Sequence, residues 1–223
     1  MRLGMVIDLK KCVGCYACTV ACKAENNSQI PEEKFWHRIF EVEKGEYPNV
    51  KKIFIPMPCF HCKEPICVTV CPTGASYKRE DGLVLIDYNK CIYCKYCVFS
   101  CPYGARVPNE KEKVVTKCTF CVQRVDKFKV PACVETCIGN ARYFGDLDNP
   151  DSEVSQLIKE RGGIQFSEKL NPSVFYLPLK PINIAKPTKP KKTKSGIAKP
   201  TKPKKEKPKE EKPTTPYVPL GCG

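Results

Sequence analysis

Sixteen of the 17 cysteines in this 223-residue chain fall into four groups of four. In chain order the groups are Cys12, Cys15, Cys18 and Cys22; Cys59, Cys62, Cys67 and Cys71; Cys91, Cys94, Cys97 and Cys101; and Cys118, Cys121, Cys133 and Cys137. The first and third groups have the spacing C-x2-C-x2-C-x3-C, the pattern that binds [4Fe–4S] clusters. The second group widens one gap to four residues, and the fourth widens it to eleven. The sixteen thiols therefore predict four [4Fe–4S] clusters and a redox function.

The spacing within a group indicates which cysteines share a cluster. Three thiolates on one loop can bind three corners of a cluster, whereas the fourth lies three residues further on, where a helix points away. The fourth cysteine therefore reaches a different cluster, as it does in two-cluster ferredoxins. A proline that turns the chain follows this cysteine in C-P-T-G-A at 71–75 and in C-P-Y-G-A at 101–105.

Pairing of the groups follows from their separation along the chain. The second and third groups lie 20 residues apart and are expected to form one two-cluster module. The first and fourth groups each lack another near neighbour, so we infer that they pair with one another. Exchange of the fourth cysteine within each pair then gives four ligand sets, numbered by the group that supplies three of the ligands. Set 1 is Cys12, Cys15, Cys18 and Cys137; set 2 is Cys59, Cys62, Cys67 and Cys101; set 3 is Cys91, Cys94, Cys97 and Cys71; set 4 is Cys118, Cys121, Cys133 and Cys22.

Two other uses of clustered cysteines match the pattern less well. A disulfide framework needs an oxidising compartment, and we expect no export signal, because the apolar run 3–7 is short and Asp8 follows it. Zinc sites use C-x2-C pairs with a longer spacer, unlike three cysteines within seven residues. The two histidines, His37 and His61, are not needed as ligands. His61 precedes Cys62, and we expect it to pack or to form a hydrogen bond near a cluster sulfur.

Only 42% of the residues are apolar even with cysteine included, which is low for an ordinary hydrophobic core. We therefore expect short elements to hold the cysteine loops. Residues 3–9 and 83–86 are predicted strands, and residues 3–9 and the segment 142–147 are expected to belong to the same module. The sequence predicts an α+β fold of two interleaved ferredoxin-like two-cluster modules with short strands, small helices and long cluster-binding loops. Both modules belong to a predicted four-cluster domain of residues 1–179. The central module is expected at about 52–107, and the outer module at about 1–30 together with 108–148.

Residues 180–223 have a different composition, which predicts a Lys/Pro-rich, low-complexity tail. The stretch 180–212 contains 13 Lys and 3 Glu, so it carries +10 of the formal net charge of +14. A nonapeptide, I-A-K-P-T-K-P-K-K, occurs at 184–192 and again at 197–205. Like charges and prolines cannot bury a core, so we predict a disordered tail with polyproline II character. It can contact anionic lipid or simply be solvated, and its Cys222 has no predicted site role.

Little else in the sequence points to chemistry. There is no Gly-rich phosphate loop, no Ser/His/Asp arrangement and no spare Cys/His pair for nucleophilic catalysis. No apolar run approaches the roughly 18 residues that a membrane-spanning helix needs, so no such helix is expected. We therefore predict a protein that carries electrons and has no catalytic residues of its own.

The cysteine motifs and their neighbours resemble a known family, the four-cluster, ferredoxin-like electron-transfer subunits of molybdopterin-dependent membrane oxidoreductases. Relatives of this type occur in polysulfide, thiosulfate, tetrathionate and dimethyl sulfoxide reductases and in membrane-bound formate dehydrogenases. The resemblance covers about residues 1–177. It is carried by C-V-G-C-Y-A-C at 12–18, P-C-F-H-C at 58–62, C-V-F-S-C-P-Y-G-A-R at 97–106, and K-C-T-F-C at 117–121 through P-A-C at 131–133 to F-G-D-L at 144–147.

The resemblance implies the same pairing, first motif with fourth and second with third. In some relatives one cysteine is replaced and a [3Fe–4S] cluster results, but every position is Cys in this sequence, which implies four [4Fe–4S] clusters. Two departures from the family pattern concern the shape of the backbone more than ligation. Tyr93 stands where Gly is common, and Ile138 follows Cys137 where Pro is usual.

The family implies partners as well. Such a subunit docks between a large molybdopterin (Mo or W) catalytic subunit and an integral membrane subunit linked to quinone or haem. The chain would then be associated peripherally with the membrane, on either its cytoplasmic or its extracytoplasmic side. The alternative is a polyferredoxin-like subunit of a hydrogenase, carbon monoxide dehydrogenase or aldehyde oxidoreductase. A third alternative is a basic nucleic-acid-binding module stabilised by zinc. Only the lysine content supports it, so we expect no nucleic-acid partner.

Overall fold

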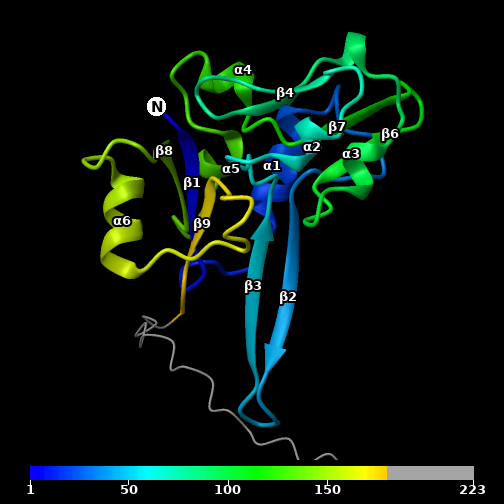
Figure 1. The fold of residues 1–223 in the computed structure, drawn as a ribbon. Coiled ribbons are helices and arrows are strands. Elements are labelled where there is room, and N and C mark those ends of the chain that lie inside the picture. Colours follow the sequence, from blue (N-terminus) through cyan, green and yellow to red (C-terminus); the bar gives the residue numbers. More distant parts are fainter. Residues whose placement is uncertain (180–223) are drawn as a thin grey trace, which may run out of the picture. The chain divides into compact units, whose positions relative to one another are not determined.

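The structure, a computed structural model, describes residues 1–179. The Lys/Pro-rich region 180–223, with its predicted tail, lies outside the described residues. Short strands and small helices alternate along the chain and are joined by long loops (Figure 1). Helices α1 (Ala17–Glu25) and α6 (Glu153–Arg161) have nine residues each, and the other α-helices have four. The prediction of an α+β fold with small elements is confirmed.

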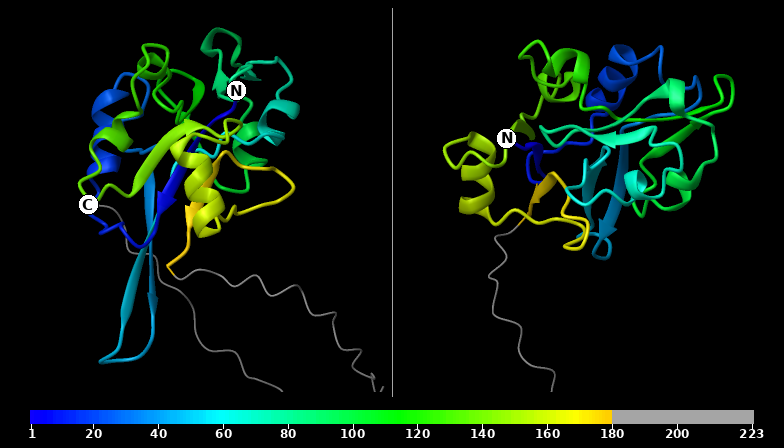
Figure 2. Two further views of the ribbon diagram at one scale, coloured as in Figure 1. Left: turned by 90° about the vertical axis from the view of Figure 1, so that its left-hand side faces the viewer. Right: turned by 45° about the horizontal axis from the view of Figure 1, so that its top comes forward.

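The largest sheet has three strands and contains both ends of the described chain. Strand β1 (Leu3–Asp8) lies in the middle, antiparallel to β8 (Arg142–Asp146) and parallel to β9 (Val174–Leu177). Helix α6 packs beside this sheet (Figure 2) through a small apolar cluster that includes Val154. The expected strand at 3–9 is therefore present, whereas its pairing with 142–146 and the strand β9 were not expected.

Two short hairpins follow the second and third cysteine groups. Strands β4 (Ser76–Lys78) and β5 (Val84–Ile86) form the first, and β6 (Arg106–Asn109) and β7 (Val114–Lys117) form the second. The predicted strand at 83–86 is β5, and its residues are largely buried as expected. These hairpins return the chain from one cysteine loop to the next.

A fourth antiparallel pair was not foreseen from the sequence. Strands β2 (Arg38–Lys44) and β3 (Lys51–Met57) form a long hairpin that projects from the body of the described chain (Figure 1). The base of the hairpin packs on the core through Ile39 and Ile55, while its outer part is exposed. Only the base therefore helps to position the cysteine loops.

The remaining helices are single turns beside the cysteines. They are α2 (Ile66–Thr69), the 3-10 helix η1 (Tyr88–Lys90), α3 (Tyr96–Phe99), α4 (Val122–Val125) and α5 (Ala132–Glu135). Helix α1 packs against α5, and α2 packs against α3. Within residues 1–179, no helix combines the length and apolar character needed to cross a lipid bilayer.

The core mixes thiols with apolar side chains. Trp36, Phe60, Phe120 and Tyr176 are fully buried large side chains in the main cluster. Several cysteines belong to the same cluster, namely Cys18, Cys22, Cys59, Cys118 and Cys133. Sulfur atoms therefore occupy interior positions that aliphatic side chains fill in an ordinary domain.

Candidate cluster-binding sites

The structure brings together the cysteines of each predicted set, and all sixteen are free thiols. The cysteines of set 1 line one cavity, and those of set 3 line another. In set 4, Cys118, Cys121 and Cys133 lie close enough to perturb the ionisation of Cys22. In set 2, Cys62 is perturbed in the same way by the three other members, Cys59, Cys67 and Cys101. Each set therefore combines three cysteines of one loop with one cysteine from a distant part of the chain.

The environment of these thiols opposes ionisation unless a positive group is present. Burial, followed by neighbouring thiols, raises the pKa of Cys62 to about 12. Burial is also the main reason that the pKa of Cys118 is raised to about 12. Burial keeps these thiols protonated at neutral pH. Iron binds the thiolate form, and its positive charge can take the place of the protons. Buried thiols such as Cys62 and Cys118 therefore have the properties of metal ligands rather than of free, reactive thiolates.

All four loops share one backbone feature, a positive φ at the residue before the second cysteine. The four residues are Gly14 (68°), His61 (41°), Tyr93 (58°) and Phe120 (56°). A side chain in this left-handed region costs about 1–2 kcal/mol, so only a loop held by its surroundings keeps it. The departure at Tyr93 thus leaves the turn unchanged, because Tyr93 adopts the conformation that Gly14 adopts in the first loop.

Three of the four groups share the turn after the last cysteine, whereas Cys22 of the first group lies inside α1. The carbonyl of Cys71 accepts a hydrogen bond from the N–H of Gly74, and that of Cys101 accepts one from Gly104. In the fourth group, Asn140 donates in the same way to Cys137, with a positive φ like that of the two glycines. The second departure, Ile138 in place of proline, therefore leaves this turn intact.

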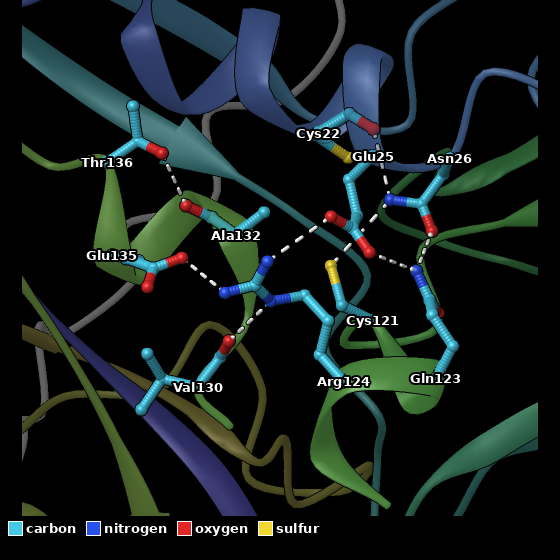
Figure 3. Close-up of polar contacts among 10 residues, drawn as sticks. All are labelled: Cys22, Glu25, Asn26, Cys121, Gln123, Arg124, Val130, Ala132, Glu135 and Thr136. Atoms are coloured by element: carbon cyan, nitrogen blue, oxygen red, sulfur yellow. Dashed lines mark hydrogen bonds and ion pairs between the residues drawn. The ribbon is translucent and has the colours of Figure 1, made fainter. Parts of the chain in front are cut away.

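Backbone or amide N–H groups donate hydrogen bonds to three of the sulfur atoms, in addition to the longer contact of Cys18 with His37. Backbone N–H groups donate to Sγ of Cys71 from Ser76 at 3.4 Å, and to Sγ of Cys137 from Ala141 at 3.3 Å. In set 4, Asn26 Nδ2 donates to Cys121 Sγ at 3.6 Å (Figure 3). Such bonds stabilise negative charge on a ligand sulfur and so influence the reduction potential.

A polar network covers set 4 and links α1 to α4 and α5 (Figure 3). Gln123 Nε2 donates to Glu25 at 2.9 Å and to Asn26 Oδ1 at 3.1 Å. The guanidinium of Arg124 pairs with Glu25 at 3.3 Å and also contacts Glu135. These residues were not found from the sequence, because each is an ordinary polar residue until the first and fourth loops meet.

Both histidines are buried, and neither was expected to be an iron ligand. His61 is buried, stacks on Phe120 with ring centroids 3.8 Å apart, and donates from Nε2 to the carbonyl oxygen of Cys118 at 3.1 Å. It packs as predicted but contacts a carbonyl rather than a sulfur. His37 lies nearer a thiol, with Nδ1 4.0 Å from Cys18 Sγ. Burial lowers the pKa of both rings, so both are neutral.

Two buried arginines test whether the sites fit an anionic cluster. Arg106 begins β6 and Arg142 begins β8, each five residues after the last cysteine of a group. Arg106 Nε and Nη1, and Arg142 Nε, are buried without a hydrogen-bond partner. Within residues 1–179, no three or more His, Cys, Asp or Glu side chains converge on a single-ion site. A cluster instead spreads four thiolates over four irons, and its net negative charge suits the two arginines.

The sets follow one another in the order 1, 4, 2, 3. Arg142 interacts with Cys18 of set 1 and with Cys133 of set 4. Cys118 of set 4 interacts with Cys59 of set 2. Arg106 interacts with cysteines of set 2 and set 3. Sets 1 and 3 are therefore terminal, and sets 4 and 2 lie between them.

Comparison with known proteins agrees with this site. A family model described as a 4Fe-4S dicluster domain matches residues 50–147, and a second with the same description matches 11–75. The chain is 48% identical over 199 residues to a sulfite dehydrogenase subunit of Allochromatium vinosum, covering 79% of this chain and 83% of the relative. It is 41% identical to a tetrathionate reductase subunit of Salmonella typhimurium, over 80% of this chain and 73% of the relative. The chain belongs to the [4Fe–4S] electron-transfer subunits of molybdopterin-type oxidoreductases.

A more distant relative broadens the family. The Hdr-like menaquinol oxidoreductase iron-sulfur subunit 1 of Archaeoglobus fulgidus is 38% identical, over 80% of this chain and 84% of the relative. This electron-transfer subunit has two dicluster matches and sixteen grouped cysteines, which correspond to four [4Fe–4S] clusters. The predicted family, cofactors and electron-relay function are confirmed, and these relatives do not favour the polyferredoxin-like alternative.

Proposed function

We propose that this subunit relays electrons along sets 1, 4, 2 and 3, between a large molybdopterin (Mo or W) catalytic subunit and an integral membrane subunit linked to quinone or haem. The observation that carries the proposal is the continuous order of four cysteine sets across the described chain. Relatives named as subunits of a sulfite dehydrogenase, a tetrathionate reductase and a menaquinol oxidoreductase support the assignment of partners.

Each set binds one cluster in this proposal, and the sixteen cysteines are the iron ligands. Sets 2 and 3 form a central module and sets 1 and 4 an outer one, interleaved along the chain. The packing of α2 on α3 and of α1 on α5, together with the β1–β8 pair, supports this division. The β6–β7 hairpin spans residue 107, so it connects the two modules.

Bound clusters supply four one-electron centres, and the chain supplies their surroundings. The loops fix the separation of the thiolates, and burial of the inner cysteines excludes water from them. Backbone N–H groups of Ser76 and Ala141 donate to sulfur atoms, which stabilises negative charge on those ligands. The residues of the chain therefore set the path and the potentials, and no residue makes or breaks a covalent bond of a substrate.

Electrons enter and leave at the terminal sets in this proposal. Cys15 in set 1 and Cys94 in set 3 are the exposed members of the sixteen cysteines. Apolar side chains are exposed beside each of them, including Val13 near Cys15 and Ile92 near Cys94. Exposed apolar side chains around a redox centre suit a protein partner, so one end faces the catalytic subunit and the other faces the membrane subunit. The subunit is then peripherally associated with the membrane.

Iron content tests the cofactor part of the proposal. The full chain, produced and purified anaerobically, should contain about sixteen irons and show four [4Fe–4S] signals on stepwise reduction in electron paramagnetic resonance. Substitution of one cysteine per set by Ser should remove or convert one signal at a time. A chain with far fewer irons, or a colourless zinc protein, would contradict the four ligand sets.

Co-purification tests the partner part. The tagged protein, isolated from its native host, should bring down a large subunit that contains molybdenum or tungsten together with a membrane protein. A nickel-containing hydrogenase or carbon monoxide dehydrogenase subunit in its place would support the polyferredoxin-like alternative. Exposed apolar residues at the two ends separate the partners, because Ile92→Ser should weaken the binding of one partner and Val13→Ser the binding of the other.

A further inference from the structure

Three positively charged side chains are buried among the cysteine sets. Arg142 is 5% exposed, Lys117 is 1% exposed and Arg106 is 4% exposed. None of them takes part in an ion pair with a carboxylate within residues 1–179. An unpaired charge in a protein interior is strongly unfavourable, so a compensating negative group must lie close to each one.

Arg142 lies between sets 1 and 4. Its Nη1 donates to His37 Nε2 at 2.6 Å, and its Nη2 lies 3.1 Å from Met5 Sδ, so neither contact neutralises the charge. The guanidinium interacts electrostatically with Cys18 of set 1 and with Cys133 of set 4. The negative groups that Arg142 faces are therefore the thiolates of two successive sets.

Arg106 occupies the equivalent place between sets 2 and 3. Its Nη2 donates to Ser76 Oγ at 2.5 Å, while Nε and Nη1 have no hydrogen-bond partner. The guanidinium interacts with Cys67 of set 2 and with Cys97 of set 3. Both arginines follow an alanine, five residues after the last cysteine of a group, which makes them a structurally equivalent pair.

Lys117 completes the series between sets 4 and 2. It ends β7, and its Nζ donates to the carbonyl oxygen of Cys118 in set 4 at 2.6 Å. Its charge also acts on Cys67 of set 2. His61 donates to the same carbonyl oxygen, but its Nδ1 accepts a hydrogen bond from the N–H of Val84 at 3.0 Å, so the ring is neutral and Lys117 is the cation at this junction.

We propose that one buried cation lies between each successive pair of clusters, and that Arg142, Lys117 and Arg106 raise the reduction potentials of the two clusters that each one flanks. The proposal rests on the four ligand sets proposed above. Reduction adds one negative charge to a cluster, and a fixed positive charge in a low-dielectric interior stabilises that state. A cation shared by two clusters stabilises the electron on either of them, so it raises both potentials without favouring one direction of transfer.

Charge-removing substitutions test the proposal on the full, cluster-loaded chain. Arg142→Gln, Lys117→Gln and Arg106→Gln are each titrated with reductant, and the four midpoint potentials are followed by electron paramagnetic resonance. Each substitution should lower two potentials by about 59 mV or more, a tenfold change in a one-electron equilibrium, and leave the other two unchanged. Arg142→Gln and Lys117→Gln should share one shifted cluster, and Lys117→Gln and Arg106→Gln should share another.

Two further variants separate charge from structure. Lys90→Gln removes a positive charge beside Cys91, but that side chain is 65% exposed and 3.6 Å from Asp87, so the potential of set 3 should change little. Arg106→Lys keeps the charge and should keep the wild-type potentials. Potentials that do not move in the Gln variants, or that all move together, would overturn the proposal.

Loss of iron from a variant is informative as well. If Arg106→Gln loses clusters, Arg106→Lys decides the matter. Retention of about sixteen irons by Arg106→Lys supports a role through charge, and the same loss in both variants contradicts it. A wild-type chain with fewer irons would instead contradict the ligand sets, so the two proposals fail in different ways.

Discussion

The inner and terminal cysteine sets of this protein differ in their surroundings. Set 4 has four buried cysteines, and set 2 has none that is exposed. Each terminal set has one exposed, one buried and two half-buried cysteines, although sets 1 and 3 lie in different proposed modules. The same pattern at both ends agrees with the proposal that sets 1 and 3 contact partner proteins. Sets 2 and 4, which have no exposed cysteine, are shielded from water.

The material between the sets differs in the same way. Where the inner sets meet, His61 stacks on Phe120 and both contact the core. The terminal loops instead expose apolar side chains such as Ile92 and Val13. Packing between the inner sets therefore contributes to folding, whereas the apolar side chains around the terminal sets stay exposed, as the proposed docking of partners requires.

Cluster removal should give the largest effect and the clearest separation of inner from terminal sets. Mild chelation under oxidising conditions should first release about eight irons, from the sets that contain Cys15 and Cys94, because only these sets expose a ligand. Complete removal should unfold residues 1–179, because the thiols that fill the core are held by their metal. Iron analysis and circular dichroism, followed together, measure both stages. Release of all four clusters in one phase, with unchanged circular dichroism, would contradict the comparison.

Truncation of an aromatic side chain should lower the free energy of unfolding much more at the junction of the inner sets than at a terminal set. Phe120 is 1% exposed at the inner junction, and Phe120→Ala should destabilise the protein by about 3–5 kcal/mol through lost burial and a cavity. Phe99 is 82% exposed beside set 3, and Phe99→Ala should change stability by less than about 0.5 kcal/mol. Anaerobic denaturant unfolding of both variants measures the difference. Equal losses would show that the rim of set 3 is packed as tightly as the junction.

A smaller effect should distinguish the two terminal loops from each other. A Cβ on Gly14 would lie 2.4 Å from the ring of Phe54, at a φ of +68°, so Gly14→Ala should cost about 2 kcal/mol. Tyr93 has the same backbone conformation in the third loop. Tyr93→Gly relieves the strain of the positive φ but raises the conformational entropy of the unfolded chain, and the two effects oppose each other. Its unfolding midpoint should stay close to that of the wild type in a thermal melt. A large loss for Tyr93→Gly would mean that the ring, and not the turn, holds this loop.

The polar network over set 4 should give the smallest effect. Arg124 joins Glu25 to Glu135, and Arg124→Ala should destabilise the protein by about 1 kcal/mol, because the pairs are partly screened by solvent. The matched terminal change, Glu110→Ala, removes the exposed pair with Lys95 beside set 3 and should have no measurable effect on unfolding. High salt should narrow the gap between the two variants. An equal loss in both would contradict the role of the network as a cover for set 4.

The chemistry of the site could be predicted from the sequence because ligand spacing is local. Three cysteines within seven residues define a cluster loop wherever the loop lies in the fold. The short strands β1 and β5 were predicted from apolar runs for the same reason. Strand β9 and the β2–β3 hairpin were missed. Val174–Leu177 is an apolar run, and residues 40–43 alternate apolar and polar, but patterns of four residues also fit short helices and loops until the partner strand is known.

Residues around the clusters were harder to find. Arg106 and Arg142 did leave a signal, an Ala-Arg pair at the same distance from Cys101 and Cys137, but repetition alone does not show burial. Asn26 left no signal, because its donor contacts a thiol 95 positions away in the chain. His61 was expected to pack or to form a hydrogen bond near a cluster sulfur; it packs on Phe120, and its hydrogen-bond partner is the carbonyl oxygen of Cys118.

The sequence alone determined the cofactor, the number of clusters and the family, since these depend on residue types at fixed short separations. Only the tertiary structure decided the order of the sets, which of them are exposed, and where buried charges lie between them. Electrostatic interactions depend on distance and on burial, and neither is fixed until loops that are far apart in the chain have packed together.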